Sequence, residues 1–209
     1  MKFELKGLYV ITDKKLIERP FFIESVEKAL SGGANILQLR EKETDYDEIV
    51  YLGKELLKIS RLYSVPLIIN DSPQLVREIG ADGVHLGKGD TTIENARNII
   101  GEDKIIGVSC YGQIERGLDA QVKGADYVAF GTPYNTPTKP GRKPTSFSTL
   151  KEAKAKITKI PIFAIGGITK ENAQDVLATG VDGIAVITSV FGSDNPKTAC
   201  IELSQILNN

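Results

Sequence analysis

The sequence has no tryptophan, one methionine, one histidine and two cysteines among its 209 residues. The single histidine, His85, excludes most of the metal and acid–base sites that combine several imidazoles. Cys110 and Cys200 show no metal-ligand spacing, which favours free thiols in a reducing cytoplasm over a disulfide. Any metal ion is therefore expected on oxygen ligands.

Long apolar runs and an excess of one charge are also absent from the sequence. No apolar stretch approaches the ~20 residues that a transmembrane helix needs, and the opening MKFELKGLYVITDKK lacks the anatomy of a signal peptide. The formal net charge is −1, so the basic surface that nucleic-acid binding needs is missing. We expect one cytoplasmic domain over residues 1–209 that binds neither nucleic acid nor membrane.

Short apolar runs alternate with amphipathic segments along the whole chain, as in parallel strands joined by helices. The expected strands are Leu8–Ile11, Ile36–Leu39, Leu67–Ile69, Val84–Leu86, Ile105–Val108, Tyr127–Phe130, Ile162–Ile165 and Ile184–Ile187. The expected helices are Phe22–Leu30, Tyr46–Leu62, Pro73–Glu78, Ile93–Ile100, Gln113–Val122, Phe147–Ile157, Ala173–Ala178 and Thr198–Leu207. Eight such units of about 26 residues predict an α/β fold, a single (β/α)8 TIM barrel, with an open doubly wound sheet as the alternative.

A short glycine motif recurs before every second expected strand. Its four copies are Gly33–Asn35, Gly80–Asp82, Gly124–Asp126 and Gly180–Asp182. The glycine is expected to end a helix in a left-handed conformation, and the Asp or Asn side chain to bond the turn backbone. Four copies, each two units apart, favour the closed barrel.

The third and fourth expected strands are followed by carboxylates at matching positions. Asn70 and Asp71 follow the third strand, and Asp90 follows the fourth. Because the carboxyl ends of parallel strands share one face of a barrel, these residues can meet there. Two carboxylates beside an amide suit Mg²⁺, which keeps most of its waters. The alternative is that Asp71 caps a helix at Ser72 and Asp90 caps one near Thr91.

The second expected strand ends in the charged sequence QLREK. Strand alternation points Gln38, Arg40 and Lys42 in one direction. In a barrel mouth, the two cations would meet a polyanion, and the arginine fork suits two phosphate oxygens. The alternative is an exposed strand end whose charges pair with Glu41 and Glu43.

The fifth expected strand is followed by Ser109, whose hydroxyl is expected either to bind a ligand or to cap the next helix. No partner histidine is expected for Ser109, so a serine nucleophile of the triad kind is rejected. Cys110 is expected to be a buried filler residue for the same reason.

Three later corners complete the candidate site. The prolines in the loop Thr136–Gly141 limit backbone freedom and suit closure over an anion, with a solvated surface loop as the alternative. The seventh strand ends in Gly166-Gly167 and the eighth in Ile187-Thr188-Ser189, where barrels often bind phosphate. A metal-and-cation pocket for a pyrophosphate and a backbone pocket for a monophosphate together predict an enzyme that joins two phosphorylated molecules and releases pyrophosphate.

Six motifs, in order along nearly the whole chain, closely resemble those of the thiamine-phosphate synthase family. They are YVITD from Tyr9, QLREK from Gln38, INDSPQLVREIGADGVHLGKGD from Ile69, IIGVS from Ile105, GADYVAFGTPYNTPTKP from Gly124 and AIGGITKENA from Ala164. The TPTK and ND-to-GVHLG motifs are specific to this family and its paralogue. The resemblance implies a Mg²⁺-dependent barrel that couples 4-amino-2-methyl-5-hydroxymethylpyrimidine diphosphate to a hydroxyethylthiazole or carboxyethylthiazole phosphate.

The resemblance also implies roles for individual residues. The implied substrate-binding residues are Gln38, Leu39, Arg40, Glu41, Lys42, Asn70 and Ser109 on the pyrimidine diphosphate side, Thr136, Pro137, Thr138 and Lys139 in the loop, and Gly167, Ile187 and Thr188 for the thiazole phosphate. Asp71 and Asp90 would bind Mg²⁺. The catalytic set would be Arg40, Lys42, Ser109 and Lys139, in a dissociative reaction in which pyrophosphate leaves before the thiazole nitrogen attacks. His85 is expected to pack near the barrel mouth.

Some positions depart from the family pattern: Thr188 replaces a common serine, Tyr111 a frequent histidine, and Lys88-Gly89 a more usual Gln-Glu.

Three rival functions remain as alternatives to the synthase. One rival is the paralogous thiazole tautomerase, which needs only the thiazole phosphate pocket. A sugar-phosphate epimerase barrel would need histidines that the chain lacks. The third rival is a non-catalytic phosphate-ligand-binding barrel that senses a thiamine precursor. The small-molecule substrates are the expected partners, with a homo-oligomer left open.

Overall fold

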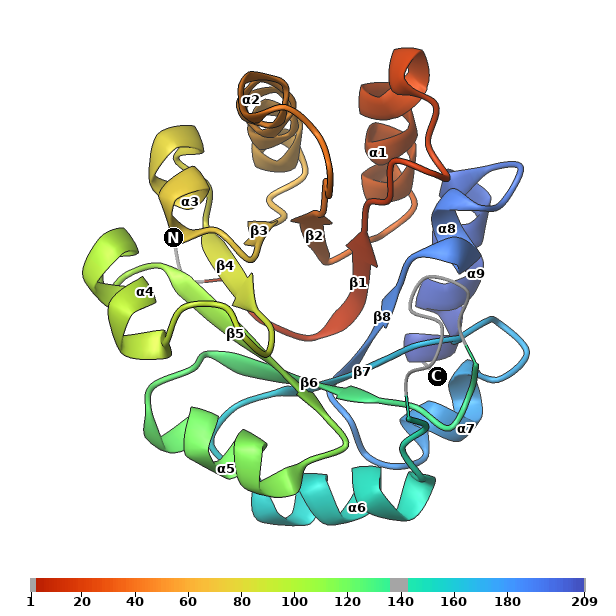
Figure 1. The fold of residues 1–209 in the computed structure, drawn as a ribbon. Coiled ribbons are helices and arrows are strands. Elements are labelled where there is room, and N and C mark those ends of the chain that lie inside the picture. Colours follow the sequence, from red (N-terminus) through yellow and green to blue (C-terminus); the bar gives the residue numbers. More distant parts are fainter. Residues whose placement is uncertain (1–2, 136–142, 209) are drawn as a thin grey trace.

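The computed structural model describes residues 3–135 and 143–208, and within them eight parallel strands close into a barrel in the order β1 to β8 (Figure 1). The strands are β1 (Gly7–Ile11), β2 (Ile36–Leu39), β3 (Leu67–Asn70), β4 (Gly83–Leu86), β5 (Ile105–Tyr111), β6 (Tyr127–Gly131), β7 (Ile162–Ile165) and β8 (Gly183–Val186). The helices are η1 (Arg19–Phe21, a 3-10 turn), α1 (Phe22–Ser31), α2 (Tyr46–Leu62), α3 (Pro73–Ile79), α4 (Ile93–Ile100), α5 (Ile114–Val122), α6 (Phe147–Lys156), α7 (Ala173–Leu177), α8 (Thr188–Phe191) and α9 (Pro196–Leu207).

The closed barrel confirms the predicted fold and shows that the open-sheet alternative is wrong, since β8 pairs with β1 in register. Two boundaries of the predicted elements differ by more than one residue. Strand β5 continues past Val108 to Tyr111 through a register shift between Ser109 and Tyr111. Helix α9 begins two residues early because Asn195 caps it by accepting hydrogen bonds from the next turn.

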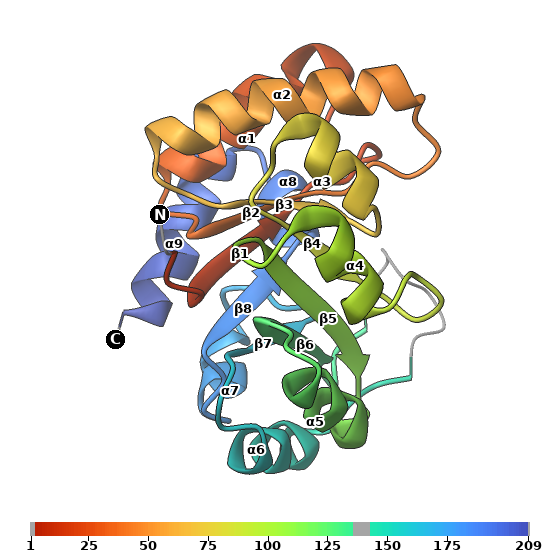
Figure 2. The same ribbon diagram turned by 90° about the vertical axis from the view of Figure 1, so that its left-hand side faces the viewer.

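Figure 2 shows the helices outside the strands from a second direction. None of the helices in the described residues combines the length and apolar character of a transmembrane span.

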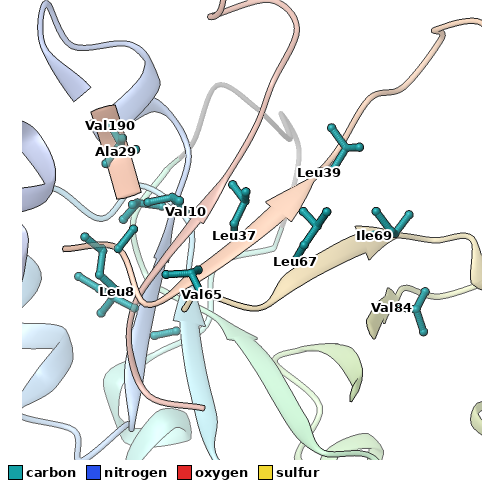
Figure 3. Packing of buried hydrophobic residues seen from close by; sticks show 14 of the residues in the cluster. Leu8, Val10, Ala29, Leu37, Leu39, Val65, Leu67, Ile69, Val84 and Val190 are labelled. Atoms are coloured by element: carbon teal, nitrogen blue, oxygen red, sulfur yellow. The ribbon is translucent and has the colours of Figure 1, made fainter. Parts of the chain in front are cut away.

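Side chains alternate between the outside and the inside of the barrel along the strands, and most of them belong to one of two apolar layers. The outer layer lies between strands and helices; Figure 3 shows Leu37 and Leu39 of β2 beside Leu67 and Ile69 of β3 in it. The inner layer fills the barrel and includes residues whose rings are almost fully buried, namely Tyr9, Tyr127 and Phe163. Their rings meet edge to face, with centroids 5.4–5.8 Å apart.

Two glycines make room for these large inner rings. Gly107 of β5 lies opposite Tyr127, and a Cβ atom there would come within 2.0 Å of the Tyr127 ring. Gly183 of β8 lies opposite Phe163, and its added Cβ would lie 2.5 Å from that ring. Alternating rings and glycines therefore let the narrow barrel interior fill without overlap.

The recurring glycine motif forms a set of clamps at the amino ends of the strands. Each Asp or Asn accepts a hydrogen bond, through its side-chain oxygen, from a backbone N–H at or near the start of the preceding strand, at 2.8–2.9 Å. The four pairs are Asn35 with Leu8, Asp82 with Leu67, Asp126 with Ile106 and Asp182 with Ile162. In return, the Asp or Asn backbone N–H donates to the carbonyl of the same strand residue.

These clamps differ in one respect from the prediction, because the side chains bond the preceding strand and not the turn. The glycines of the motif do adopt left-handed conformations, with φ between 81° and 99°. Three of the carboxylates also pair with cations at 2.6–2.9 Å, namely Asp82 with Arg61, Asp126 with Arg97 and Asp182 with Lys154. Each clamp thus fixes the register of one strand pair.

Substituting Asp82 tests the clamps. Asp82→Ala should lower the free energy of unfolding by about 2 kcal/mol, because the buried Leu67 N–H loses its acceptor. Asp82→Asn should cost about 1 kcal/mol or less, since the amide oxygen of Asn35 accepts the equivalent backbone hydrogen bond and the Arg61 side chain of the lost ion pair is 46% exposed. Urea denaturation measures both. Equal losses would show that the ion pair, not the backbone bond, carries the effect.

Candidate active site

A cavity of about 1130 Å³ opens at the carboxyl ends of the strands. Its lining comes from both the inward-facing side chains and the loops that follow the strands. Of the sequence-predicted site residues that the structure describes, those lining it are Gln38, Arg40, Lys42, Asn70, Asp71, Ser109, Gly167, Ile187 and Thr188. The structure therefore gathers the separate corners into one space, as the barrel prediction requires.

A chain of buried side chains forms the floor of this cavity. Gln38 Nε2 lies 2.5 Å from the Tyr9 hydroxyl, which lies 2.8 Å from the Tyr127 hydroxyl. The Tyr127 hydroxyl lies 2.9 Å from His85 Nδ1, and His85 Nε2 lies 2.8 Å from Ser109 Oγ. The five residues come from β2, β1, β6, β4 and β5, so the chain crosses the barrel interior.

The prediction that Ser109 has no partner histidine is wrong. It rested on residue types along the chain, whereas His85 and Ser109 lie on neighbouring strands with their side chains in contact. Ser109 also does not cap the next helix, because β5 continues through it to Tyr111. His85 is packed as expected, buried and stacked on Tyr127 with ring centroids 5.5 Å apart.

Both cysteines are free, as predicted, and both are buried, which was predicted for Cys110. Burial raises the pKa of the Cys110 thiol to about 12, and burial likewise raises that of Cys200 to about 12. Neither is a reactive thiolate near neutral pH.

Arg40 and Lys42 line the cavity. Their ion-pair partners are not Glu41 and Glu43, which were the partners expected for an exposed strand end. Arg40 Nη1 lies 3.2 Å from Asp13 Oδ2, and Lys42 Nζ lies 3.6 Å from Asp71 Oδ2. Thr12 adds a further contact, since its hydroxyl accepts from the Arg40 N–H at 2.9 Å. Asp13 was not predicted from the sequence; its place just after β1 was the available signal.

Leu39 and Glu41, which alternate with Gln38, Arg40 and Lys42, turn away from the cavity. Leu39 belongs to the outer apolar layer. The Glu41 side chain is fully buried and pairs with Arg19, with Oε2 2.8 Å from Nη2. This pair ties the segment after β2 to η1. Substrate contact by Leu39 or Glu41 stays a prediction, restricted to their backbone.

The structure excludes helix capping as the role of the two predicted metal ligands. Ser72 caps α3 by accepting from Leu75 N–H, and Thr92 caps α4 by accepting from Asn95 N–H. Asp71 instead adopts a left-handed conformation, with φ 66°, and its N–H donates to the His85 carbonyl. Asp90 turns back so that its carboxylate accepts from Gly87 N–H at 2.6 Å.

This donor set fits a hard divalent cation. Asp71 lines the cavity at the end of β3, and Asp90 is held beside Gly87, which lines it at the end of β4. Residues 3–135 and 143–208 contain no cluster of three or more possible His, Cys, Asp or Glu ligands. Two carboxylates are nevertheless sufficient for Mg²⁺, because that ion retains several waters and takes its other ligands from substrate phosphates.

The opposite side of the cavity is built from backbone and hydroxyl groups. Gly167 has φ 63°, and a Cβ atom there would lie 2.2 Å from the Asn135 carbonyl oxygen. Thr188 begins the short helix α8 and lines the cavity next to Ile187. The neighbouring Ser189 hydroxyl donates to the Ile168 carbonyl, which ties the two loops together. This side suits a phosphate group that approaches the backbone closely.

Two of the departures from the family pattern contact each other. The Lys88 N–H donates to the Tyr111 hydroxyl at 3.0 Å, so Tyr111 holds the loop after β4. Thr145 in turn donates its hydroxyl hydrogen to the Tyr111 carbonyl at 3.2 Å. Lys143 and Thr145 also line the cavity and were not predicted. The predicted residues Thr136, Pro137, Thr138 and Lys139 lie outside the described residues.

Fold and site together define a phosphate-handling (β/α)8 barrel enzyme. A family model described as thiamine monophosphate synthase matches residues 8–190. The chain is 44% identical over 200 residues to a thiamine-phosphate synthase of Clostridium novyi, covering 95% of this chain and 97% of that protein. It is 41% identical over 208 residues to that of Methylococcus capsulatus, covering 100% and 92%.

A solved structure gives the same assignment. Thiamine phosphate pyrophosphorylase from Pyrococcus furiosus superposes with a TM-score of 0.88 at 40% identity, covering 97% of this chain and 95% of that one. The chain belongs to the thiamine monophosphate synthase family, a family of transferases in thiamine biosynthesis. The family resemblance seen in the sequence motifs is confirmed.

Gly167→Ala tests the close backbone approach on the β7 side. The new methyl group would push against the Asn135 carbonyl and displace the loop, so we expect kcat/KM for the thiazole phosphate to fall about 10-fold or more. Gly124→Ala is the matched control, because it has φ 84° but nothing within 4 Å of the added Cβ. The control should lose about 1 kcal/mol of stability and keep its kinetics. Equal kinetic losses would remove the argument for close approach.

Proposed function

We propose that this protein joins 4-amino-2-methyl-5-hydroxymethylpyrimidine diphosphate to a thiazole phosphate. The hydroxyethyl form reacts with release of pyrophosphate, and the carboxyethyl form with release of pyrophosphate and carbon dioxide. The observation that carries the proposal is the division of one cavity. Arg40 and Lys42 after β2 and Asp71 after β3 lie on one side, and glycines and hydroxyls that follow β7 and β8 lie on the other. The first side suits a departing pyrophosphate and the second a retained monophosphate.

The diphosphate binds to the β2–β4 side. Arg40 is oriented by Asp13, and Lys42 lies beside Asp71, so both cations are positioned before substrate arrives. Asp71 and Asp90 hold Mg²⁺, which when bound supplies charge neutralisation to the leaving pyrophosphate. Lys139 would add a further cation. The Glu41–Arg19 pair keeps the segment with both cations in place.

The pyrimidine ring lies over the cavity floor, against Gln38, Asn70 and Ser109. Its methylene carbon–oxygen bond breaks first, and the electron pair leaves with pyrophosphate. The thiazole nitrogen then donates its own electron pair to the resulting cation, forming the new carbon–nitrogen bond. This dissociative order needs no protein nucleophile and no strong general base, since neither bond change takes a proton from carbon.

The thiazole phosphate binds on the β7–β8 side, where Gly167, Ile187 and Thr188 surround its phosphate. The family resemblance assigns binding of its ring to Thr136, Pro137 and Thr138, which lie outside the described residues. Thr188 keeps the hydroxyl of the common serine, so the phosphate keeps its donor. The Tyr111–Lys88 contact holds the loop that ends in Asp90, which offsets the change of residue types there.

Two rival functions share this fold. A thiazole tautomerase needs the β7–β8 side but has no use for the arrangement of Arg40, Lys42 and Asp71, which is intact. A binding protein that senses a thiamine precursor would hold both ligands without turnover. We place the enzyme in the cytoplasm, acting on small molecules without nucleic acid, with a homo-oligomer permitted.

A coupling assay tests the proposed function. Purified protein receives Mg²⁺, the pyrimidine diphosphate and a thiazole phosphate, and thiamine phosphate and pyrophosphate are followed together. Equimolar formation of both products, abolished by EDTA and restored by excess Mg²⁺, is expected. Folded protein that binds the thiazole phosphate and forms neither product would refute the proposal and favour the tautomerase or the sensor.

Substitutions of the two carboxylates test the metal assignment. Asp71→Asn and Asp90→Asn should each lower kcat by ~10²-fold and raise the Mg²⁺ concentration needed for half-maximal rate. Asparagine is chosen because it tolerates the left-handed backbone at position 71 and keeps an oxygen for the Gly87 N–H. Asp119→Asn, on the exposed surface of α5, is the control. Near-normal rates and Mg²⁺ dependence in both variants would exclude the assignment.

A further inference from the structure

Four of the five residues in the hydrogen-bonded chain across the cavity floor line the cavity, and the central one, Tyr127, does not. Gln38, Tyr9, His85 and Ser109 line the cavity, whereas Tyr127 is fully buried and is not among the lining residues. Tyr127 nevertheless contacts both Tyr9 and His85, at 2.8 and 2.9 Å. A change at Tyr127 therefore reaches the substrate only through its neighbours.

The direction of each hydrogen bond follows from the number of hydrogens available. Either tyrosine could donate in the Tyr9–Tyr127 contact. Gln38 Nε2 is a donor, so the Tyr9 oxygen accepts from it, and the acceptor that the described residues offer to the single Tyr9 hydrogen is the Tyr127 oxygen. The Tyr127 hydroxyl in turn directs its single hydrogen to His85 Nδ1. A neutral imidazole that accepts at Nδ1 carries its proton on Nε2, which donates to Ser109 Oγ.

We propose that Tyr127 is a positioning residue that fixes His85 as the Nε2–H tautomer and thereby turns the Ser109 hydroxyl into a donor toward the substrate. We call this order of donors and acceptors the polarity of the chain. It leaves the Gln38 side-chain carbonyl oxygen as an acceptor at the other end. The floor then selects a ring that presents a hydrogen-bond donor to Gln38 and an acceptor to Ser109. A ring with an exocyclic amine and ring nitrogens has both; this identification of the ring rests on the proposed function.

The environment of the two tyrosines supports this polarity. Burial raises the pKa of Tyr9 and raises that of Tyr127 well above the ordinary value. Both therefore remain phenols with one hydrogen to give. Stacking of His85 on Tyr127 and the edge contacts of Tyr127 with Tyr9 and Phe163 hold the rings in place.

The polarity also decides what the Ser109–His85 contact does. A serine nucleophile requires an unprotonated imidazole nitrogen to take the hydroxyl proton. In the proposed tautomer, the nitrogen that faces Ser109 already carries a proton. The pair therefore orients a substrate and does not activate a nucleophile, in agreement with a dissociative reaction.

The single histidine of the chain makes the tautomer directly measurable. In protein labelled with ¹⁵N-histidine, every imidazole signal comes from His85, and nitrogen shifts distinguish a protonated from a bare nitrogen. At about pH 8, where an ordinary imidazole is neutral, we expect the proton on Nε2 and a bare Nδ1. A proton on Nδ1 alone, or on both nitrogens, would overturn the proposal.

Tyr127→Phe keeps the ring and removes only the hydroxyl that joins Tyr9 to His85. We expect signals of the Nδ1–H tautomer to appear and kcat/KM for the pyrimidine diphosphate to fall about 10-fold, with the KM of the thiazole phosphate within about twofold of wild type. Phe163→Leu is the control for packing, since it loosens the same ring cluster without removing any hydrogen bond of the chain. It should lower stability and leave the tautomer unchanged.

Two outcomes would refute the role of Tyr127: an unchanged tautomer and unchanged kinetics in Tyr127→Phe, or the same tautomer shift in Phe163→Leu. The tautomer is read without substrate, so it is independent of the coupling assay. Wild-type protein that couples the substrates but carries the proton on Nδ1 refutes this inference alone. Protein with the expected tautomer but without coupling refutes the proposed function alone.

Discussion

The clamps at the amino ends of the strands fix the register on which everything else in this barrel depends. Each side-chain oxygen and backbone N–H of the motif binds one residue of the preceding strand, which locks the strands in four pairs through Asn35, Asp82, Asp126 and Asp182. A slip of one residue would move every inward side chain to the helix side. The glycine motif therefore acts far from the cavity, yet it determines which side chains line it.

With the register fixed, the interior is divided into apolar filling and a polar floor. Large rings on β1, β6 and β7 fill the barrel, where Gly107 and Gly183 give them space. The hydroxyls of Tyr9 and Tyr127 would be costly to bury alone, and the chain from Gln38 to Ser109 satisfies them. The same bonds that stabilise the core thus orient the groups that face the substrate.

Above this floor, the two sides of the cavity differ in chemistry because they come from different strands. The segment after β2 brings Arg40 and Lys42 to the side of Asp71, and the buried Glu41–Arg19 pair anchors that segment from behind. The loops after β7 and β8 offer glycine backbone and Thr188 instead. One side suits a leaving group with several negative charges, and the other suits a phosphate that stays with the product.

Much of this arrangement was predictable from the sequence, because it depends on local patterns. Apolar runs and the glycine repeat predicted the barrel, and the residues at the ends of several runs predicted nine of the residues that line the cavity. The sequence does not show which side chains meet across the barrel interior. The Ser109–His85 contact was missed because it depends on the extension of β5 and on barrel curvature. Asp13 escaped prediction because its partner Arg40 lies 27 positions away along the chain.

The central claim is that the two sides of one cavity bind the two phosphate-bearing products. A crystal structure with thiamine phosphate, pyrophosphate and Mg²⁺ tests it most directly. We predict pyrophosphate at Arg40 and Lys42, with the metal between it and Asp71 and Asp90, and the thiamine phosphate monophosphate group at Gly167 and Thr188. Pyrophosphate on the β7–β8 side, or a metal bound away from both carboxylates, would contradict the account.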